Sequence, residues 1–241
     1  MTTLIKIVIT AVLTLTLFSC NFDLNLNHGV RGNGEVITVD RATKQFSAIK
    51  ATEGLDVYIT QGSTESITVE ADENIQELIM TDIEDGVLRI HTKENIGYAS
   101  AKKVHIIFKN ISSIITTSGS DLYATNTITT KSLTLKSTSG SDMTLDINTS
   151  FVDCSSTSGS DITLSGKTTK LIAQATSGSD IKAADLISES SDVRATSGAN
   201  ITINTYKELT ANATSGGEIK YYGNPEKINK SDGVSGSIRQ Q

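Results

Sequence analysis

Four aspartates recur at the same place in a repeated motif, and their type and spacing could support cation binding. Each follows a Gly-Ser pair, and the four are Asp121, Asp142, Asp161 and Asp180. If the copies stack in register, neighbouring carboxylates lie about 5 Å apart and repel by about 0.8 kcal/mol per pair at water-like dielectric. A bound Ca²⁺ could offset this repulsion, because hard cations take carboxylate oxygens. Alternatively, each aspartate accepts hydrogen bonds from backbone N–H groups or serine hydroxyls in a bend.

The rest of the same column favours the second interpretation. It continues as Asn200 and Glu218, and an Asp-to-Asn change keeps a hydrogen-bond acceptor but loses the charge. The Ca-binding nonapeptide pattern Gly-Gly-x-Gly-x-Asp is also absent. We therefore predict no metal site and no cofactor, and keep the four aspartates as the candidates should a cation bind.

Other residue types give no catalytic pattern. His28, His91 and His105 are isolated, and none has a partner at metal-ligand spacing. No Gly-x-Ser-x-Gly elbow occurs, and Gly-Ser-Asp recurs too evenly to be a unique active site. We interpret the lysines near the repeats as a solvated face and predict that the protein is not an enzyme. These lysines are Lys131, Lys136, Lys167, Lys170 and Lys182.

The aspartates belong to a motif, Thr-Ser-Gly-Ser-Asp, that the chain repeats with small changes. Its glycines fall at 119, 140, 159, 178, 198, 216 and 236, so the steps range from 18 to 21 residues. A period near 20 residues is typical of a solenoid, in which each repeat stacks on its neighbours.

Within each repeat, residues two apart form a row that is apolar at both ends and small in the middle. One such row runs from Val152 to Leu164 and places Ser158 inside. This is the period of a strand, and a strand in the next coil can cover the inner face that one strand leaves open. We predict an all-β fold, a single-stranded parallel, right-handed β-helix with about 18–21 residues per coil and an irregular N-terminal β section.

Composition narrows the partners of the protein. The 241 residues contain 5% aromatic residues and no Trp, and the formal net charge is −6. A nucleic-acid-binding protein would need a basic face, so we predict no nucleic acid partner. A large aromatic core is also excluded, although a solenoid does not need one.

The start of the chain reads as an export signal. Residues 1–6 are a short basic start and residues 7–18 an apolar run, too short to span a bilayer. The run ends in Leu17-Phe18-Ser19-Cys20, which resembles a bacterial lipobox and implies cleavage before Cys20 and a lipid on its thiol. An ordinary signal peptide with an incidental Cys is the alternative. Cys154 then has no intrachain partner, and we expect it to be a buried thiol.

These signals divide the chain into four parts. Residues 1–19 are the lipoprotein signal peptide, 20–33 a tether, 34–110 irregular β coils or a cap, and 111–241 the regular β-helix repeats. In the third part, Asp85-Gly86 between two apolar runs predicts a hairpin. Residues 104–108 predict the last strand before the regular coils.

Several motifs in this order resemble a known family. They are the lipobox, Gly32-Asn33-Gly34, Phe46-Ser47-Ala48-Ile49, the run Leu55–Gly62, Asp85–Ile90 and the Ser-Gly-Ser-Asp coils. Together they resemble the head GIN domain family (putative auto-transporter adhesin), here as a Bacteroidetes-type lipoprotein, over about residues 34–238. The resemblance implies an exported β-helical domain and supplies no catalytic residues.

From these observations we expect an exported, lipid-anchored cell-envelope protein that binds a partner or acts as a scaffold, without catalysis. We expect the protein to attach to the membrane through the lipid on Cys20. Its other partner is an unknown envelope component, glycan or protein. Asn21 after the Cys favours the outer membrane. The alternative functions are a carbohydrate-active β-helix that acts on or binds polysaccharide, and a purely structural envelope spacer.

Overall fold

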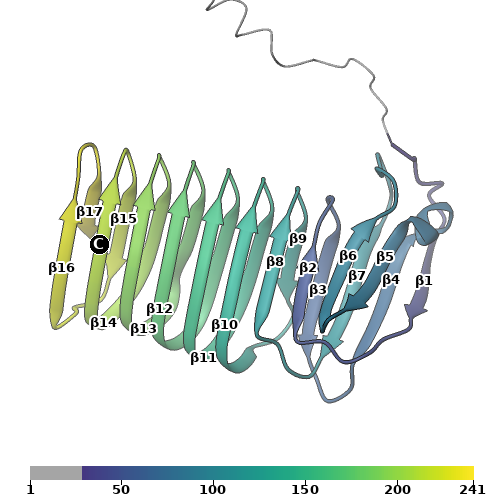
Figure 1. The fold of residues 1–241 in the computed structure, drawn as a ribbon, viewed down its shortest axis with the longest axis horizontal. Coiled ribbons are helices and arrows are strands. Elements are labelled where there is room, and N and C mark those ends of the chain that lie inside the picture. The colour runs from purple at the N-terminus through teal and green to yellow at the C-terminus, as the bar shows by residue number, and fades with distance from the viewer. Residues whose placement is uncertain (1–28) are drawn as a thin grey trace, which may run out of the picture.

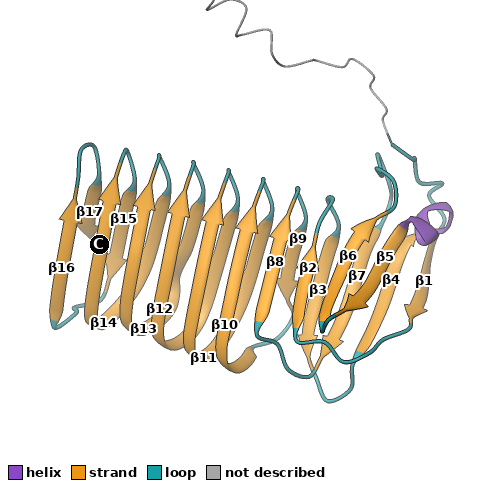
Figure 2. Cartoon of the chain, in the orientation of Figure 1, coloured by secondary structure: helices purple, strands orange, loops and turns teal. Residues whose placement is uncertain are grey.

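The computed structural model describes residues 29–241, so the predicted signal peptide, Cys20 and most of the predicted tether lie outside the described residues. The described chain consists of strands joined in one sheet, with one short 3-10 helix (Figure 2). None of these residues forms a helix long and apolar enough to cross a membrane. The elements are β1 Val36–Arg41, β2 Ala48–Ala51, β3 Asp56–Gln61, β4 Ser66–Asp72, η1 Glu73–Leu78, β5 Ile79–Glu84, β6 Val87–Thr92, β7 Lys102–Phe108, β8 Ser113–Thr117, β9 Asp121–Ala124, β10 Ile128–Thr138, β11 Asp142–Thr157, β12 Asp161–Thr176, β13 Asp180–Thr196, β14 Asn200–Thr214, β15 Glu218–Tyr222, β16 Lys227–Asp232 and β17 Ser237–Gln240.

Parallel coils stack along one axis from β8 to β17 (Figure 1). Each of β11 to β14 is a long strand, bent near its middle, that runs from one Thr-Ser-Gly turn to the next. Between β11 and β12, for example, Met143 lies opposite Ile162 and Val152 lies opposite Leu171. The predicted all-β solenoid is therefore confirmed, and the N-terminal part is a mixed sheet.

The core lies inside the coils and follows the period of two. In β11, Leu145 and Ile147 are buried before the bend, and Val152 and Cys154 are buried after it. The alternation shifts by one residue at the bend, where Ser150 and Phe151 are adjacent and neither is buried. Each coil thus buries its apolar row against the next coil, as a solenoid requires.

The Thr-Ser-Gly turns correct one detail of the predicted inner row. Ser158 is exposed, with φ 58°, and Gly159 follows with φ 69°. The prediction that Ser158 points inward is wrong, because these two left-handed residues reverse the chain. The inward residues are Ser156 and Ser160, both fully buried. The turn contains two residues, Ser158 and Gly159, between the two strand segments that it joins. Because two residues equal one period of the strand pattern, the alternation in the sequence continues through the turn and does not reveal it.

Two more coils precede the regular ones, and their order in space differs from their order in the chain. The coil β2–β3 lies between the coils β6–β7 and β8–β9. Ala48, for example, pairs with Val87 on one side and Ser113 on the other. Along the sequence, the chain therefore forms the coil β2–β3 first, then the terminal coil β6–β7 on one side of it, and then the coil β8–β9 on its other side.

Antiparallel strands cover the N-terminal end of the stack. Strand β4 pairs with β7, β1 pairs with β4, and β5 pairs with β6. The β5–β6 turn is Asp85-Gly86, with φ 50° and 75°, which confirms the predicted hairpin. We call β1, β4, β5 and η1 the cap.

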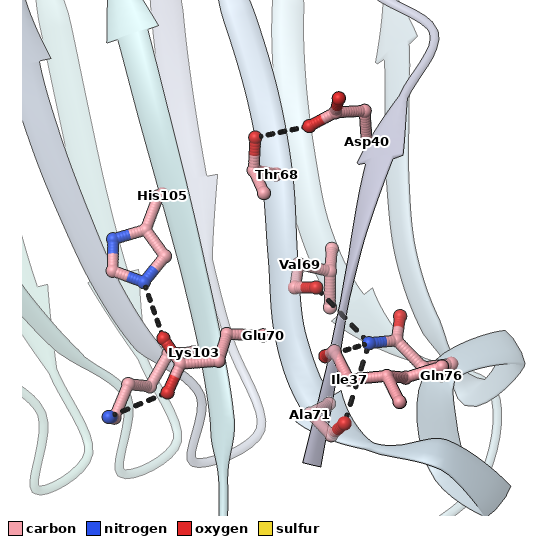
Figure 3. Close-up of polar contacts among 9 residues, drawn as sticks. All are labelled: Ile37, Asp40, Thr68, Val69, Glu70, Ala71, Gln76, Lys103 and His105. Atoms are coloured by element: carbon pink, nitrogen blue, oxygen red, sulfur yellow. Dashed lines mark hydrogen bonds and ion pairs between the residues drawn. The ribbon is translucent and has the colours of Figure 1, made fainter.

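Gln76 ties the cap together from inside (Figure 3). Its side-chain N–H₂ group donates to the backbone carbonyls of Ile37, Val69 and Ala71 at 2.9, 3.1 and 3.5 Å. The side-chain oxygen of Gln76 accepts from the guanidinium of Arg41 at 2.9 Å. These bonds satisfy polar groups that would otherwise be buried without partners.

The opposite end of the stack is covered by β16, which carries charged residues in line with an inner row. Strand β16 places Ile228, Lys230 and Asp232 in line with the inner row of β14. The Lys230 Nζ donates to the hydroxyl of Tyr221 at 2.6 Å and lies 4.4 Å from its ring centroid. Charges in an inner row discourage another strand from pairing with this edge.

Candidate functional site

The aspartates that follow each turn form a column on one face of the solenoid. Asp121, Asp142, Asp161 and Asp180 occupy equivalent positions in paired strands. The structure adds Asp56, which pairs with Asp121 from the preceding coil. Sequence reasoning missed Asp56 because its turn reads Thr-Glu-Gly-Leu-Asp instead of Thr-Ser-Gly-Ser-Asp. Its two turn residues, with φ 67° and 68°, nevertheless match the later copies.

Neighbouring coils supply partners to part of this column. Asp161 accepts from Lys182 Nζ at 2.6 Å, and this bond raises the pKa of Lys182. Asp180 accepts from the amide of Asn200 at 2.8 Å. At Asp121, burial and then the charges of Asp142 and Asp56 raise the carboxyl pKa. The partners of Asp161 and Asp180 are thus side chains of the next coil, which differs from the bend acceptors considered above.

The column does not converge on a point. In the part of the chain that the structure describes, no three His, Cys, Asp or Glu side chains are grouped so that they could hold a metal ion. A straight row of carboxylates with strand spacing presents a repeated surface instead of a closed coordination shell.

Behind the column, the serines of the turns form a hydroxyl ladder between coils. Ser160 Oγ donates to the carbonyl of Ser137 at 2.8 Å, and Ser179 Oγ repeats this bond to Ser156 at 2.8 Å. The Thr157 N–H donates to Ser160 Oγ at 3.1 Å. The ladder fixes each turn to the coil before it, and so sets the position of the aspartate that follows.

Aromatic rings stack where this face meets the cap. The ring centroids of His105 and Tyr58 lie 5.2 Å apart, and those of Tyr58 and Tyr123 lie 5.5 Å apart. Glu70 accepts from Lys103 at 3.0 Å and contacts the His105 ring nitrogen at 3.3 Å (Figure 3). The bond from Lys103 lowers the pKa of Glu70 although burial opposes it. Because the rings cover one another, they offer little free ring surface for a ligand.

The other edge of the coils, where β10 to β14 bend, borders an open groove of about 620 Å³. Two rows of side chains flank it, and they change from coil to coil. Asn148 lies opposite Lys167, which lies opposite Ile187. The groove is lined before the bend by Thr129, Asn148, Lys167 and Ile187, and after it by Lys131, Ser150, Thr169, Glu189 and Tyr206.

The groove revises the interpretation of the lysines. Lys131 and Lys167 come from different coils but line one groove, whereas Lys182 is paired with Asp161. Sequence reasoning treated all of them as scattered surface charges. The sequence signal that could have revealed the groove is the loss of repetition at the bend of each coil. The residues there vary because the stacking of coils does not require them.

Cys154 takes no part in either surface. It is fully buried in the inner row, and its thiol lies 3.4 Å from the carbonyl of Ile172. Burial raises the pKa of the thiol far above its usual value, which disfavours the reactive thiolate. A role as a small core residue accounts for its position.

Comparison with known proteins places these features in a family. The family described as putative auto-transporter adhesin, head GIN domain, matches residues 45–225. Three similar crystal structures each cover 88% of this chain. They are a putative adhesin from Bacteroides fragilis (TM-score 0.81, 20% identity, 100% of that chain), a putative lipid binding protein from Parabacteroides distasonis (0.70, 19%, 99%) and a putative adhesin from Parabacteroides merdae (0.70, 20%, 98%). At these identities they show the fold alone. No curated protein matches.

Proposed function

This chain belongs to the head GIN domain family of putative auto-transporter adhesins, and we propose that it is an exported, lipid-anchored envelope protein that binds a partner without catalysis. Its role is that of an adhesin or a scaffold at the cell surface or in the periplasm, held at the outer membrane by a lipid on Cys20. The observation that carries this proposal is the repeated surface of the solenoid. Successive coils display Thr, Ser and Asp at one spacing, and such an array suits extended contact with a large partner.

The named relatives support binding without showing it for this chain. Two of the three similar structures above are described as adhesins. The lipobox-like run before Cys20 supports attachment to a membrane, because a lipid on the first mature residue anchors a chain that has no spanning helix among residues 29–241.

A carbohydrate-active enzyme is the alternative function, and the groove is the observation that favours it. General acid–base cleavage of a polysaccharide needs two suitably placed groups, usually two carboxylates. Among the described residues that line the groove, Glu189 is the only carboxylate, and it is paired with Lys207. The groove therefore supports binding of a polysaccharide better than its cleavage.

The test of binding is a pull-down from intact envelope preparations with the purified protein, followed by assays of glycan turnover on whatever is captured. We expect saturable capture and no turnover. Turnover would support the enzyme, and the absence of capture would leave only the role of spacer.

The test of the anchor is Cys20→Ala. We expect the wild type to incorporate labelled fatty acid and the variant to move from the membrane to the soluble fraction, with an unchanged melting temperature. A variant that stays in the membrane, or a wild type without label, would contradict the proposed anchor.

A further inference from the structure

We propose that the groove at the bends of β10 to β14 binds one strand of an acidic polysaccharide, whose carboxylates pair with Lys131 and Lys167. This inference rests on the proposed binding function and names its site and ligand class.

The groove has the shape of a site for a linear polymer. It crosses five successive coils, and four strand spacings correspond to about 19 Å along the solenoid axis. It is open to solvent. A chain longer than the groove can therefore lie in it, whereas a small molecule would be only partly enclosed.

Its side chains suit a hydroxylated ligand. Thr129, Asn148, Ser150 and Thr169 can donate and accept hydrogen bonds. At one end, the Tyr206 side chain is 42% exposed, and aromatic rings combine an apolar face with a polar tip. Ile187, which is 52% exposed, also lines the groove. These two residues offer apolar surface against which the C–H face of a sugar ring can pack.

Charge selects the acidic members of this class. Between residues 29 and 241, neither Lys131 nor Lys167 has an ion-pair partner, while Glu189 is held by Lys207. The unpaired charge of the lining is thus positive, although the protein as a whole carries −6. Because the protein as a whole is negatively charged, it repels polyanions at long range. An anionic ligand therefore needs the local positive charges of Lys131 and Lys167.

The experiment compares two probes that differ only in charge. Oligogalacturonate and its methyl ester are titrated calorimetrically into the purified full-length protein at low and physiological salt. We expect saturable binding of the acid that weakens with salt. The ester should bind at least tenfold more weakly, which corresponds to about 1.4 kcal/mol.

Variants locate the site. Lys131→Gln and Lys167→Gln should each weaken binding of the acid by about fivefold to tenfold and leave binding of the ester unchanged. Tyr206→Ala should weaken both probes. The matched controls are Lys136→Gln and Tyr98→Ala, which change exposed residues outside the groove and should alter neither affinity.

Three outcomes would overturn the inference. Equal affinity for acid and ester would contradict the acidic class. Capture of envelope material that survives all three groove substitutions would place the binding surface elsewhere, while leaving the proposed function intact. If neither the probes nor envelope material bind, the inference and the proposed function both fail.

Discussion

The two edges of the solenoid are built on the same coils, yet they differ in what their residues must do. At the turn edge, the six turns from Ser118-Gly119 to Ser215-Gly216 repeat a Ser followed by a Gly, both in the left-handed region. At the bend edge, the equivalent positions change from coil to coil, for example from Lys131 to Tyr206. The turn edge therefore presents the same Thr, Ser and Asp side chains from coil to coil, whereas the bend edge presents a different set of side chains in each coil.

The cause of this difference is conformational. Two consecutive left-handed residues cost about 1–2 kcal/mol each when they carry a side chain, and only Gly avoids this cost. Glycine therefore recurs at these turns, and a buried serine follows it in four of them, at Ser120, Ser141, Ser160 and Ser179. The bends need no common turn residue. A glycine is required only where the backbones of two coils come close together, as at Gly166.

The largest expected effect comes from a glycine of the bend edge. A Cβ on Gly166 would lie 2.1 Å from the carbonyl oxygen of Ile147 in the preceding coil, and φ is 101°. Gly166→Ala must push two coils apart, so we expect a loss of more than about 3 kcal/mol in urea unfolding.

Gly159→Ala at the turn edge is the matched control. Its φ is also positive, at 69°, but a Cβ there would meet nothing within 4 Å, and we expect a loss of only about 1 kcal/mol. Equal losses for the two variants would contradict the contrast drawn between the two edges.

A smaller effect separates the two sides of one turn. Ser160 is fully buried and bonded to Ser137 and Thr157, whereas Ser158 is exposed. We expect Ser160→Leu to destabilise by about 2–4 kcal/mol, because it overpacks the coil and leaves polar groups unpaired. Ser158→Leu should cost under about 1 kcal/mol. If thermal unfolding ranked them in the opposite order, the inside and outside of the turn would be misassigned.

The stability of the cap should depend on pH through the buried carboxylate of Asp72. Burial alone would raise the pKa of Asp72, but N–H groups of Ala101, Gly34 and Ser100 donate to its carboxylate and lower the pKa. The ionised form therefore stabilises the fold above the ordinary Asp pKa, and this contribution is lost as pH falls through the lowered value.

Asp72→Asn is the variant that measures this contribution. We expect it to lower the melting temperature at neutral pH, and the difference from wild type to shrink in acid. The exposed bond between Asp40 and Thr68 makes Asp40→Asn the control, with little change at either pH. A wild-type-like Asp72→Asn would show that the cap does not depend on this carboxylate.

The smallest effect belongs to the acidic column. The pKa of Asp121 is raised, so its ionised form is less favourable in the folded state than in the unfolded chain. Asp121→Asn should therefore stabilise the fold slightly, by up to about 0.5 kcal/mol above the raised pKa. This gain should vanish as pH falls below the ordinary Asp value. Destabilisation at neutral pH would show that the charge of Asp121 is needed.

Features that come from stacking or from a local turn could be predicted from the sequence. The period near 20 residues and the row from Val152 to Leu164 are consequences of stacking, so they predicted the solenoid. The Asp85-Gly86 hairpin was predicted because its turn geometry is local. The inward position of Ser158 was predicted wrongly, because a two-residue reversal leaves the period of two unchanged.

The groove and the full column could not be found in this way. Lys131 and Lys167 are 36 positions apart in the sequence, and only the stacking of coils brings them to one groove. Asp56 joins the column through a pairing with Asp121, 65 residues later, and its turn differs in two letters from the repeat. Both depend on contacts between segments, which a local pattern does not contain.

The position of β2–β3 between β6–β7 and β8–β9 has a consequence for how the chain folds. Regular coils close contacts about 19 residues apart, as between Met143 and Ile162, so each can form as soon as its neighbour exists. Ala48 instead waits for partners 39 and 65 residues later, and such distant contacts form slowly. Pulse-labelled hydrogen exchange during refolding should therefore protect β11 to β13 before β2 and β3. Strands β2 and β3, which are synthesised early, are then among the last to pair with their neighbours. Until they do so, both of their edges are open to pairing with another chain.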